Sequence, residues 1–400
     1  MWLATSALNE PTADPPQVRW RTVGIVALVV LAAIAVGRLV MIGTRQPPPH
    51  PLLGPVANGL IAYSKDGDIH VGDASTGTST AIVSGPESDI NPIFSPDGSR
   101  IAFIRGKPGS AASLIVVRSD GSDERVVVPE GPGIVFAWTP NNLSLFVMRG
   151  NAGYLYLFDA SGVAEPQLVT PPFPAERGAM PFNASAQVAP MFRPPAGDLI
   201  MSGGWDSLQV FDADFTPVRQ LDFGHAQYDS LTGFPIWSPD GARILLGVAY
   251  YDPFPTVFVD GEMIVMDADG GDLRRLGPGW NPLWSPDSSS IAYEDVGPGA
   301  FPNNPDEVRI AVLDLASGTK RVLESSMSPV KVGATVETMT SNEWHTWYYE
   351  GWSWSPDGRS LLLLKDHRTR PVVVDITTDT ATELPWETDS APSWQRVATG

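Results

Sequence analysis

The chain has 400 residues, no cysteine and a formal net charge of −19 at pH 7. This charge argues against nucleic-acid binding, because phosphate backbones are held by clusters of Lys and Arg. The absence of cysteine excludes disulfides and thiolate metal sites. Glycine (38) and proline (39) fall mainly between short apolar runs, a pattern typical of many short strands joined by turns.

One long apolar run lies near the start of the chain, at residues 22–43 (TVGIVALVVLAAIAVGRLVMIG). As a helix it would be about 33 Å long, enough to cross a hydrocarbon core of roughly 30 Å. We therefore predict a short cytoplasmic tail at 1–21, a single transmembrane signal anchor at 22–43 and a Pro-rich tether at 44–57. The remaining chain is then extracytoplasmic at the cell membrane. The alternative is a cleaved signal peptide, with Ala33-Ile34-Ala35 as a weak cleavage motif.

A short phrase, an aromatic residue followed by Ser-Pro-Asp-Gly or a variant, recurs through the rest of the chain. Apolar residues stand seven and nine positions after the aromatic residue in every full copy, which is the period of a strand. Pro presets its backbone angle and Gly accepts positive φ, so the phrase predicts a turn between two strands. The copies begin at Phe94, Trp138, Phe192, Trp237, Trp284 and Trp354, and a truncated copy contains Trp394.

A third strand, usually ending on an aspartate, and a fourth strand follow in each unit. Four antiparallel strands per unit are the blade of a β-propeller, and a recurring unit of this size is typical of repeat architectures. The last unit stops after its first strand at Trp394, whereas residues 60–64 begin a unit at its second strand. Joining these ends completes a seventh blade and removes the open sheet edges. We predict an all-β, seven-bladed β-propeller at 58–398, closed by its N- and C-terminal strands and preceded by one transmembrane helix.

The phrase tryptophans recur once per blade, so we expect them to pack between neighbouring blades rather than to bind a cofactor. The aspartates that end the third strands are expected to accept hydrogen bonds from backbone N–H groups in the following turns. They are Asp73, Asp159, Asp212, Asp267, Asp314 and Asp375. The group formed by Asp267, Asp269 and Asp272 lacks the spacing of a full calcium loop, and we predict no metal and no cofactor.

These repeats resemble those of the TolB-type, WD40-like β-propellers of bacteria, whose hallmark is an aromatic-Ser-Pro-Asp-Gly turn followed by Ile-Ala-Phe. Residues 94–103 (FSPDGSRIAF) are close to this consensus, and the resemblance extends from about Asn58 to Val397. The copy at Phe192 departs most, with Pro195-Ala196 in place of Asp-Gly. TolB carries an additional α/β domain and works in the periplasm with partner proteins. That domain is not expected here, because only 57 residues precede the first strand, and TolB's specific role is not carried over.

Strand direction places the long segments at one face of the predicted propeller. Segments of more than about 12 to 15 residues without their own structure are usually functional or disordered. The aromatic residues in them offer the amphipathic surface that is enriched at binding hot spots, although they could instead pack an insertion onto its own blade. The long segments are 170–189, 249–261, 296–306 and 325–351. The predicted binding residues are Trp344, His345, Trp347, Tyr348, Tyr349, Tyr250, Tyr251, Phe254 and Phe301.

The sequence has no Gly-x-Ser-x-Gly elbow, no HExxH motif and no Gly-rich phosphate loop. We therefore predict that the protein is not an enzyme but a membrane-anchored propeller that binds a protein or peptide, or acts as a scaffold, through its long-loop face. Two alternatives stay open. One is a hydrolase or lyase with a site at the mouth of the central channel, and the other is a transmembrane regulator with anti-sigma-like control.

Overall fold

The structure is a computed structural model that describes residues 56–106, 111–131, 134–139, 141–149, 154–169, 193, 199–202, 207–212, 216–222, 230–231, 235–253, 256–295, 309–326, 352–365 and 370–399. The chain divides into two compact units, Met1–Pro49 and His50–Gly400, and every described residue belongs to the second. The predicted tail, transmembrane anchor and most of the tether lie outside the described residues. Within the described part, no helix is long and apolar enough to cross a membrane.

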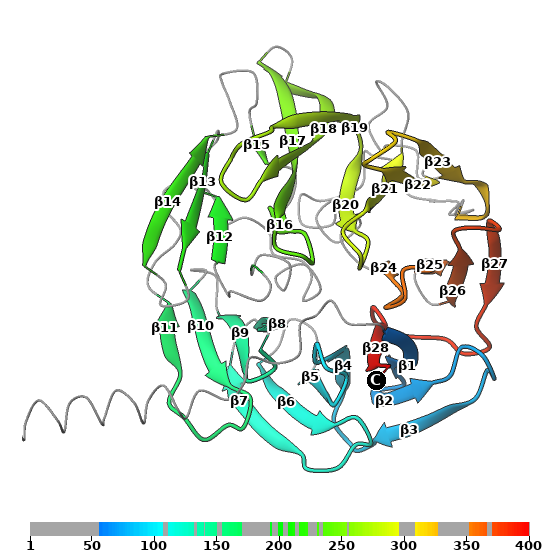
Figure 1. Cartoon of the computed structure of the whole chain (residues 1–400). Coiled ribbons are helices and arrows are strands. Elements are labelled where there is room, and N and C mark those ends of the chain that lie inside the picture. Colours follow the sequence, from blue (N-terminus) through cyan, green and yellow to red (C-terminus); the bar gives the residue numbers. More distant parts are fainter. Residues whose placement is uncertain are drawn as a thin grey trace, which may run out of the picture. The chain divides into compact units, whose positions relative to one another are not determined.

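The second unit consists of antiparallel sheets that follow one another in chain order around a centre (Figure 1). In each complete sheet the first strand lies nearest the centre and the fourth lies outermost, which is the blade arrangement of a β-propeller. The sheet that shows this most simply consists of β4 (Asp89–Phe94), β5 (Arg100–Arg105), β6 (Ala112–Arg118) and β7 (Arg125–Gly131), paired in that order.

Three other four-stranded sheets repeat this order. They contain β8 (Ile134–Trp138), β9 (Ser144–Arg149), β10 (Tyr154–Asp159) and β11 (Gln167–Val169); β20 (Trp280–Trp284), β21 (Ser290–Asp295), β22 (Arg309–Asp314) and β23 (Lys320–Leu323); and β24 (Ser353–Trp354), β25 (Ser360–Lys365), β26 (Arg370–Asp375) and β27 (Thr380–Glu383). A short 3-10 helix, η3 (Glu324–Ser326), follows β23.

Two sheets depart from this order. The three-stranded sheet contains β12 (Leu199–Ser202), β13 (Ser207–Phe211) and β14 (Pro217–Asp222), and a first strand near Phe192 would fall outside the described residues. The five-stranded sheet contains β15 (Ser230–Leu231), β16 (Ile236–Trp237), β17 (Arg243–Pro253), β18 (Thr256–Asp267) and β19 (Arg274–Pro278), with β15 and β16 both paired to β17.

The two ends of the propeller sequence meet in one sheet, as the sequence predicts. This sheet has the order β28 (Ser393–Ala398), β1 (Val56–Lys65), β2 (Asp68–Gly72) and β3 (Ser79–Val83). In β28, the amide of Gln395 accepts a hydrogen bond from the backbone N–H of Leu60 (3.1 Å) and donates one to the carbonyl of Gly98 in the neighbouring sheet (2.8 Å). The C-terminal strand therefore links its own sheet to the next one.

The repeated phrase forms a tight turn because its own polar groups satisfy one another. The Ser95 hydroxyl donates to the Asp97 carboxylate (2.6 Å), which also accepts the backbone N–H of Ser99 (3.0 Å). Gly98 has φ of 71°, a conformation that glycine adopts at little cost. Asn142 takes the same position in the next copy with φ of 63°, and its side chain accepts the backbone N–H of Asp97 in the preceding sheet (2.9 Å). This departure from the consensus thus links two blades.

The phrase tryptophans lie between blades, as predicted. The indole N–H of Trp138 donates to the carbonyl of Ile93 in the preceding sheet (3.1 Å), and that of Trp354 donates to Leu283 in the same way (3.3 Å). Among the described residues, the buried indole nitrogen of Trp237 has no hydrogen-bond partner. Its preceding blade is the one whose phrase departs from the consensus, where Arg193 instead covers the Trp237 ring at 5.2 Å and donates to the carbonyl of Gly241 (2.8 Å).

The hydrophobic core is divided among the spaces between blades. One cluster joins Leu114 of β6 to Phe136 and Trp138 of β8, and every other hydrophobic cluster of described residues also combines two neighbouring sheets. Burial of these side chains at about 25 cal/mol per Å² of apolar surface is the main term that holds the blades together.

The aspartates that end the third strands cap the following turns, with one correction. Asp73, Asp159, Asp212, Asp314 and Asp375 each accept a backbone N–H two to four residues ahead. In the turn after β18 this role falls to Asp269, which accepts the N–H of Gly271 (2.9 Å), and not to Asp267. Asp267 instead closes the turn with its backbone groups.

Candidate functional site

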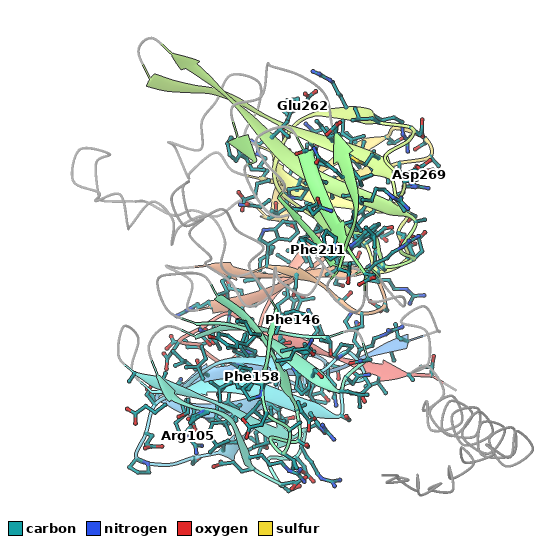
Figure 2. All side chains as sticks on the ribbon, turned by 90° about the vertical axis from the view of Figure 1, so that its left-hand side faces the viewer. Arg105, Phe146, Phe158, Phe211, Glu262 and Asp269 are labelled. Carbon is teal, nitrogen blue, oxygen red and sulfur yellow. The ribbon has the colours of Figure 1, made fainter. Side chains whose placement is uncertain are left out.

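The two ends of the sheets differ in what they carry. Because neighbouring strands are antiparallel, the turns between first and second strands lie at one end, and the ends of second strands lie at the other. The first end holds the short phrase turns, such as residues 95–99. β11, β21 and β23 end at the second end, and in the sequence they precede the long segments 170–189, 296–306 and 325–351. We name this second end the long-loop face. In Figure 2, Asp269, which belongs to a short turn, and Glu262 lie toward opposite ends of the same sheet.

The segment 249–261, predicted as a loop, is a strand hairpin instead. β17 and β18 pair from Arg243↔Asp267 to Pro253↔Thr256, so the hairpin continues well beyond the paired part of β16 and β19. Figure 2 shows it projecting from its sheet on the long-loop side. The physical reason lies in residues 256–259 (TVFV), whose β-branched and aromatic side chains favour strands. We name residues 249–261 the hairpin arm.

The predicted binding residues fall into two groups. Tyr250 and Tyr251 lie in β17, opposite Asp260 and Phe258 of β18, so they belong to the hairpin arm and not to a loop. The other predicted binding residues lie outside the described residues, and their role stays a prediction: Phe254, Phe301, Trp344, His345, Trp347, Tyr348 and Tyr349.

A network of charges at the long-loop face centres on Arg105, the last residue of β5. Its guanidinium binds both oxygens of Asp89 (2.8 and 3.0 Å) and both oxygens of Glu124 (2.7 and 3.0 Å). Its side chain also covers the Phe103 ring at 5.5 Å. The hydrogen bonds to Asp89 and Glu124 raise the pKa of Arg105, so it stays charged. The Asp89 side chain is only 2% exposed, and burial raises its pKa despite the Arg105 guanidinium.

The sheet of β20 to β23 contains a related ion pair with the charges exchanged. Asp295, at the end of β21, takes the place of Arg105 and binds Lys320 of β23 (2.9 Å). Lys320 lies 5.7 Å from the centre of the Tyr293 ring, which corresponds to Phe103. Burial raises the pKa of Tyr293, so its hydroxyl stays protonated at neutral pH. Each network joins side chains from different parts of one sheet, so both networks stabilise the sheets that contain them.

At the long-loop face, hydrogen bonds hold the connection from β27 to β28 against the end of β1. The Thr388 hydroxyl donates to the carbonyl of Ser390 (2.7 Å), and the hydroxyls of Ser64 and Ser390 bond to each other (2.7 Å). The carboxylate of Asp389 accepts the backbone N–H of Asp66 (2.6 Å). Sequence reasoning did not identify this network or the Arg105 network, because their members are far apart in sequence and follow no shared motif.

The polar groups described at the long-loop face are thus largely engaged with one another. Within the described part of the chain, no group of three or more His, Asp or Glu side chains is placed to hold a metal ion. Asp269 is engaged with its own turn, and Asp272 lies 3.4 Å from Arg274. These hydrogen bonds and ion pairs hold the ends of the described strands in place at the long-loop face.

Comparison with known proteins identifies the fold. No family model matches the chain, and a search of curated proteins found no significant match. Among solved structures, the chain is similar to an oligogalacturonate lyase in complex with manganese, with a TM-score of 0.53, 16% sequence identity, and coverage of 79% of this chain and 84% of that one. TolB from Acinetobacter baumannii is also similar, with a TM-score of 0.46, 15% identity, and coverage of 85% and 82%. The likeness to the lyase agrees with the sheet order of the structure, and both support the β-propeller fold that the repeats predict.

Proposed function

We propose that the protein is a membrane-anchored, seven-bladed β-propeller that binds a protein or peptide partner outside the cytoplasm through its long-loop face. The observation that carries this proposal is the difference between the two ends of the sheets. The short turns are closed by their own hydrogen bonds, whereas the hairpin arm extends from the opposite end, where the strands that precede the other long segments also end. Long segments on a rigid scaffold are where proteins commonly carry recognition.

The entry point of the chain supports this arrangement. β1 begins at Val56, which pairs with Ala398 at the end of β28, so the chain enters the propeller at the short-turn end. The first described strand of the propeller thus begins at the end opposite the long-loop face. The tether at 44–57 is rich in proline and would keep an extended form of about 3.1 Å per residue.

We further propose that this face recognises a partner and does not catalyse a reaction. Asp89, the most buried carboxylate of the Arg105 network, is held by two guanidinium nitrogens, which keeps it from serving as a general base. The aromatic residues of the segment 343–350 (EWHTWYYE) supply the amphipathic contact area that protein partners use.

The test is capture of partners by the full-length chain in detergent, compared with a variant in which Trp344, Trp347 and Tyr348 are changed to Ala. We expect the variant to lose the captured partner while its thermal unfolding changes little. The matched control is Leu143→Ala with Val163→Ala, which removes exposed apolar side chains at the short-turn end and should leave capture unchanged. A large loss of stability in the triple variant would show that these aromatics pack the insertion instead.

The proposed topology has its own test. Because the natural chain has no cysteine, a single cysteine at Val163, which is 83% exposed, can be labelled specifically. A membrane-impermeant maleimide should label it in intact cells. Labelling only after the membrane is opened would place the propeller inside the cell and contradict the proposal.

A further inference from the structure

The hairpin arm has one strand edge without a partner among the described residues. β19 pairs with β18 only from Glu262 to Val265, so it stops short of the arm. Residues 256–260 of β18 pair with β17 on one side, and no described strand pairs with their other side. On the opposite edge of the hairpin, β15 already pairs with Val248 and Ala249 of β17. Among the described residues, the backbone N–H and C=O groups on the outer edge of 256–260 thus have no strand partner.

Apart from one bulge, the residues of this edge lack the features that usually prevent strands from pairing with other chains. Natural edges are protected by proline, lysine, a bulge that turns the edge away, or a covering segment. Residues 256–259 are TVFV, with no proline, glycine or lysine, and their composition favours strands. The hairpin has Pro253 on β17, and the register shift opposite Tyr250 and Tyr251 leaves Val259 of β18 as a bulge, so the regularly paired part of this edge is 256–258. The edge of β18 is thus suited to accept another strand.

The charges of the arm indicate what kind of strand it would accept. The stretch from Ile244 to Leu273 contains no Lys or Arg. Its acidic residues are Asp252 and Asp260 within the arm and Glu262 at its base, which pairs with Arg275, whereas Asp267, Asp269 and Asp272 lie at the short-turn end of the sheet. A second copy of this chain would bring the same acidic residues, and its own net charge of −19, against this edge. Charge complementarity therefore favours a basic partner over self-association.

We propose that residues 256–260 of β18 bind an extended, basic peptide segment of a partner protein by strand addition. Main-chain hydrogen bonds would supply the affinity, and basic residues flanking a β-branched core would supply selectivity. This inference rests on the proposed function, because it names the class of partner that the long-loop face recognises. Binding at this edge would depend on the backbone of β18, whereas binding by the segment 343–350 would depend on its aromatic side chains.

The probe is the peptide Lys-Lys-Val-Thr-Val-Thr-Val-Lys-Lys, titrated onto the full-length chain in detergent. We expect a variant in which residues 250–260 are replaced by an Asn-Gly turn to bind it at least tenfold more weakly, while thermal unfolding still reports a folded propeller. The matched control is a peptide with Glu in place of every Lys, which should also bind at least tenfold more weakly. Binding of the Lys peptide should weaken as salt is raised. Equal binding by the wild-type and arm-trimmed chains would overturn the proposal.

Methylation of the peptide backbone distinguishes strand addition from general attraction between charges. An added strand uses the N–H groups of alternate residues only. Two peptides methylated at nitrogen in the two alternating frames should therefore differ, with one frame abolishing binding and the other preserving it. The same result for both frames would contradict strand addition.

Two further outcomes separate this inference from the proposed function. A partner captured equally by the wild-type and arm-trimmed chains would support the long-loop face and refute the role of β18. Frame-dependent binding of the peptide without capture of any partner would support the β18 edge and count against the proposed function. A wild-type dimer that trimming dissociates would show that the edge receives a second copy, which overturns the assignment to a basic partner.

Discussion

Replacing Gln395 by Ala tests how the propeller is closed. The Gln395 amide lies in β28 and bonds to the backbone N–H of Leu60 in its own sheet and to the carbonyl of Gly98 in the next. The substitution leaves both backbone groups without these partners. A net contribution of about 0.5–1.5 kcal/mol for each bond predicts a loss of about 1–3 kcal/mol in the free energy of unfolding. Both bonds are partly exposed, so the lower half of this range is expected.

Chemical unfolding followed by Trp fluorescence measures this loss, and hydrogen exchange locates it. Exchange should accelerate first in β28 and β1, because these strands join the two ends of the ring. Gln395→Glu keeps an acceptor for Leu60 but no donor for Gly98, so it should lose about half as much. The control Gln167→Ala, at an exposed position of β11, should change stability little. If Gln395→Ala is no more destabilising than Gln167→Ala, the closure does not depend on this side chain.

Two further predictions concern the tryptophans and the turns. Trp138→Phe removes the hydrogen bond to Ile93 and should cost about 1 kcal/mol more than Trp237→Phe, since the Trp237 nitrogen has no partner; equal losses in thermal unfolding would contradict this. Stability should also fall as the pH drops below about 4. Burial opposes ionisation of Asp97, but hydrogen bonds from Ser95 and Ser99 outweigh it and lower its pKa. A carboxyl group with a lowered pKa stabilises the fold above its ordinary pKa and loses this effect as the pH falls through the folded value. Asp97→Asn should therefore flatten the acid side of the stability curve, and an unchanged slope would refute the assignment.

Much of the fold follows from interactions that are local in sequence. The phrase turn is closed within a few residues by Ser95, Asp97 and Gly98, so its sequence predicts its shape wherever it recurs. The spacing of the copies then predicts the blades, and the incomplete units at the two ends predict the pairing of β1 with β28. The caps on the third strands are equally local, and only the prediction for Asp267 was wrong, because Asp269 accepts the N–H of Gly271 in that turn.

The candidate site was less predictable. The segment 249–261 was predicted as one of the long loops, yet the pairing between β17 and β18 extends to Pro253 and Thr256. The register between two paired strands depends on the sequences of both, so it could not be predicted from one strand alone.

The sequence by itself determined the repeating turn, the strand periodicity and the need for the two chain ends to share a sheet. Only the tertiary structure decided which side chains meet between blades and at the long-loop face. Arg105 binds Asp89 and Glu124, and Asn142 reaches Asp97 of the preceding blade, through distances that depend on how the sheets pack. Turns form from neighbouring residues and repeat with their sequence, whereas contacts between blades join residues that packing alone brings together.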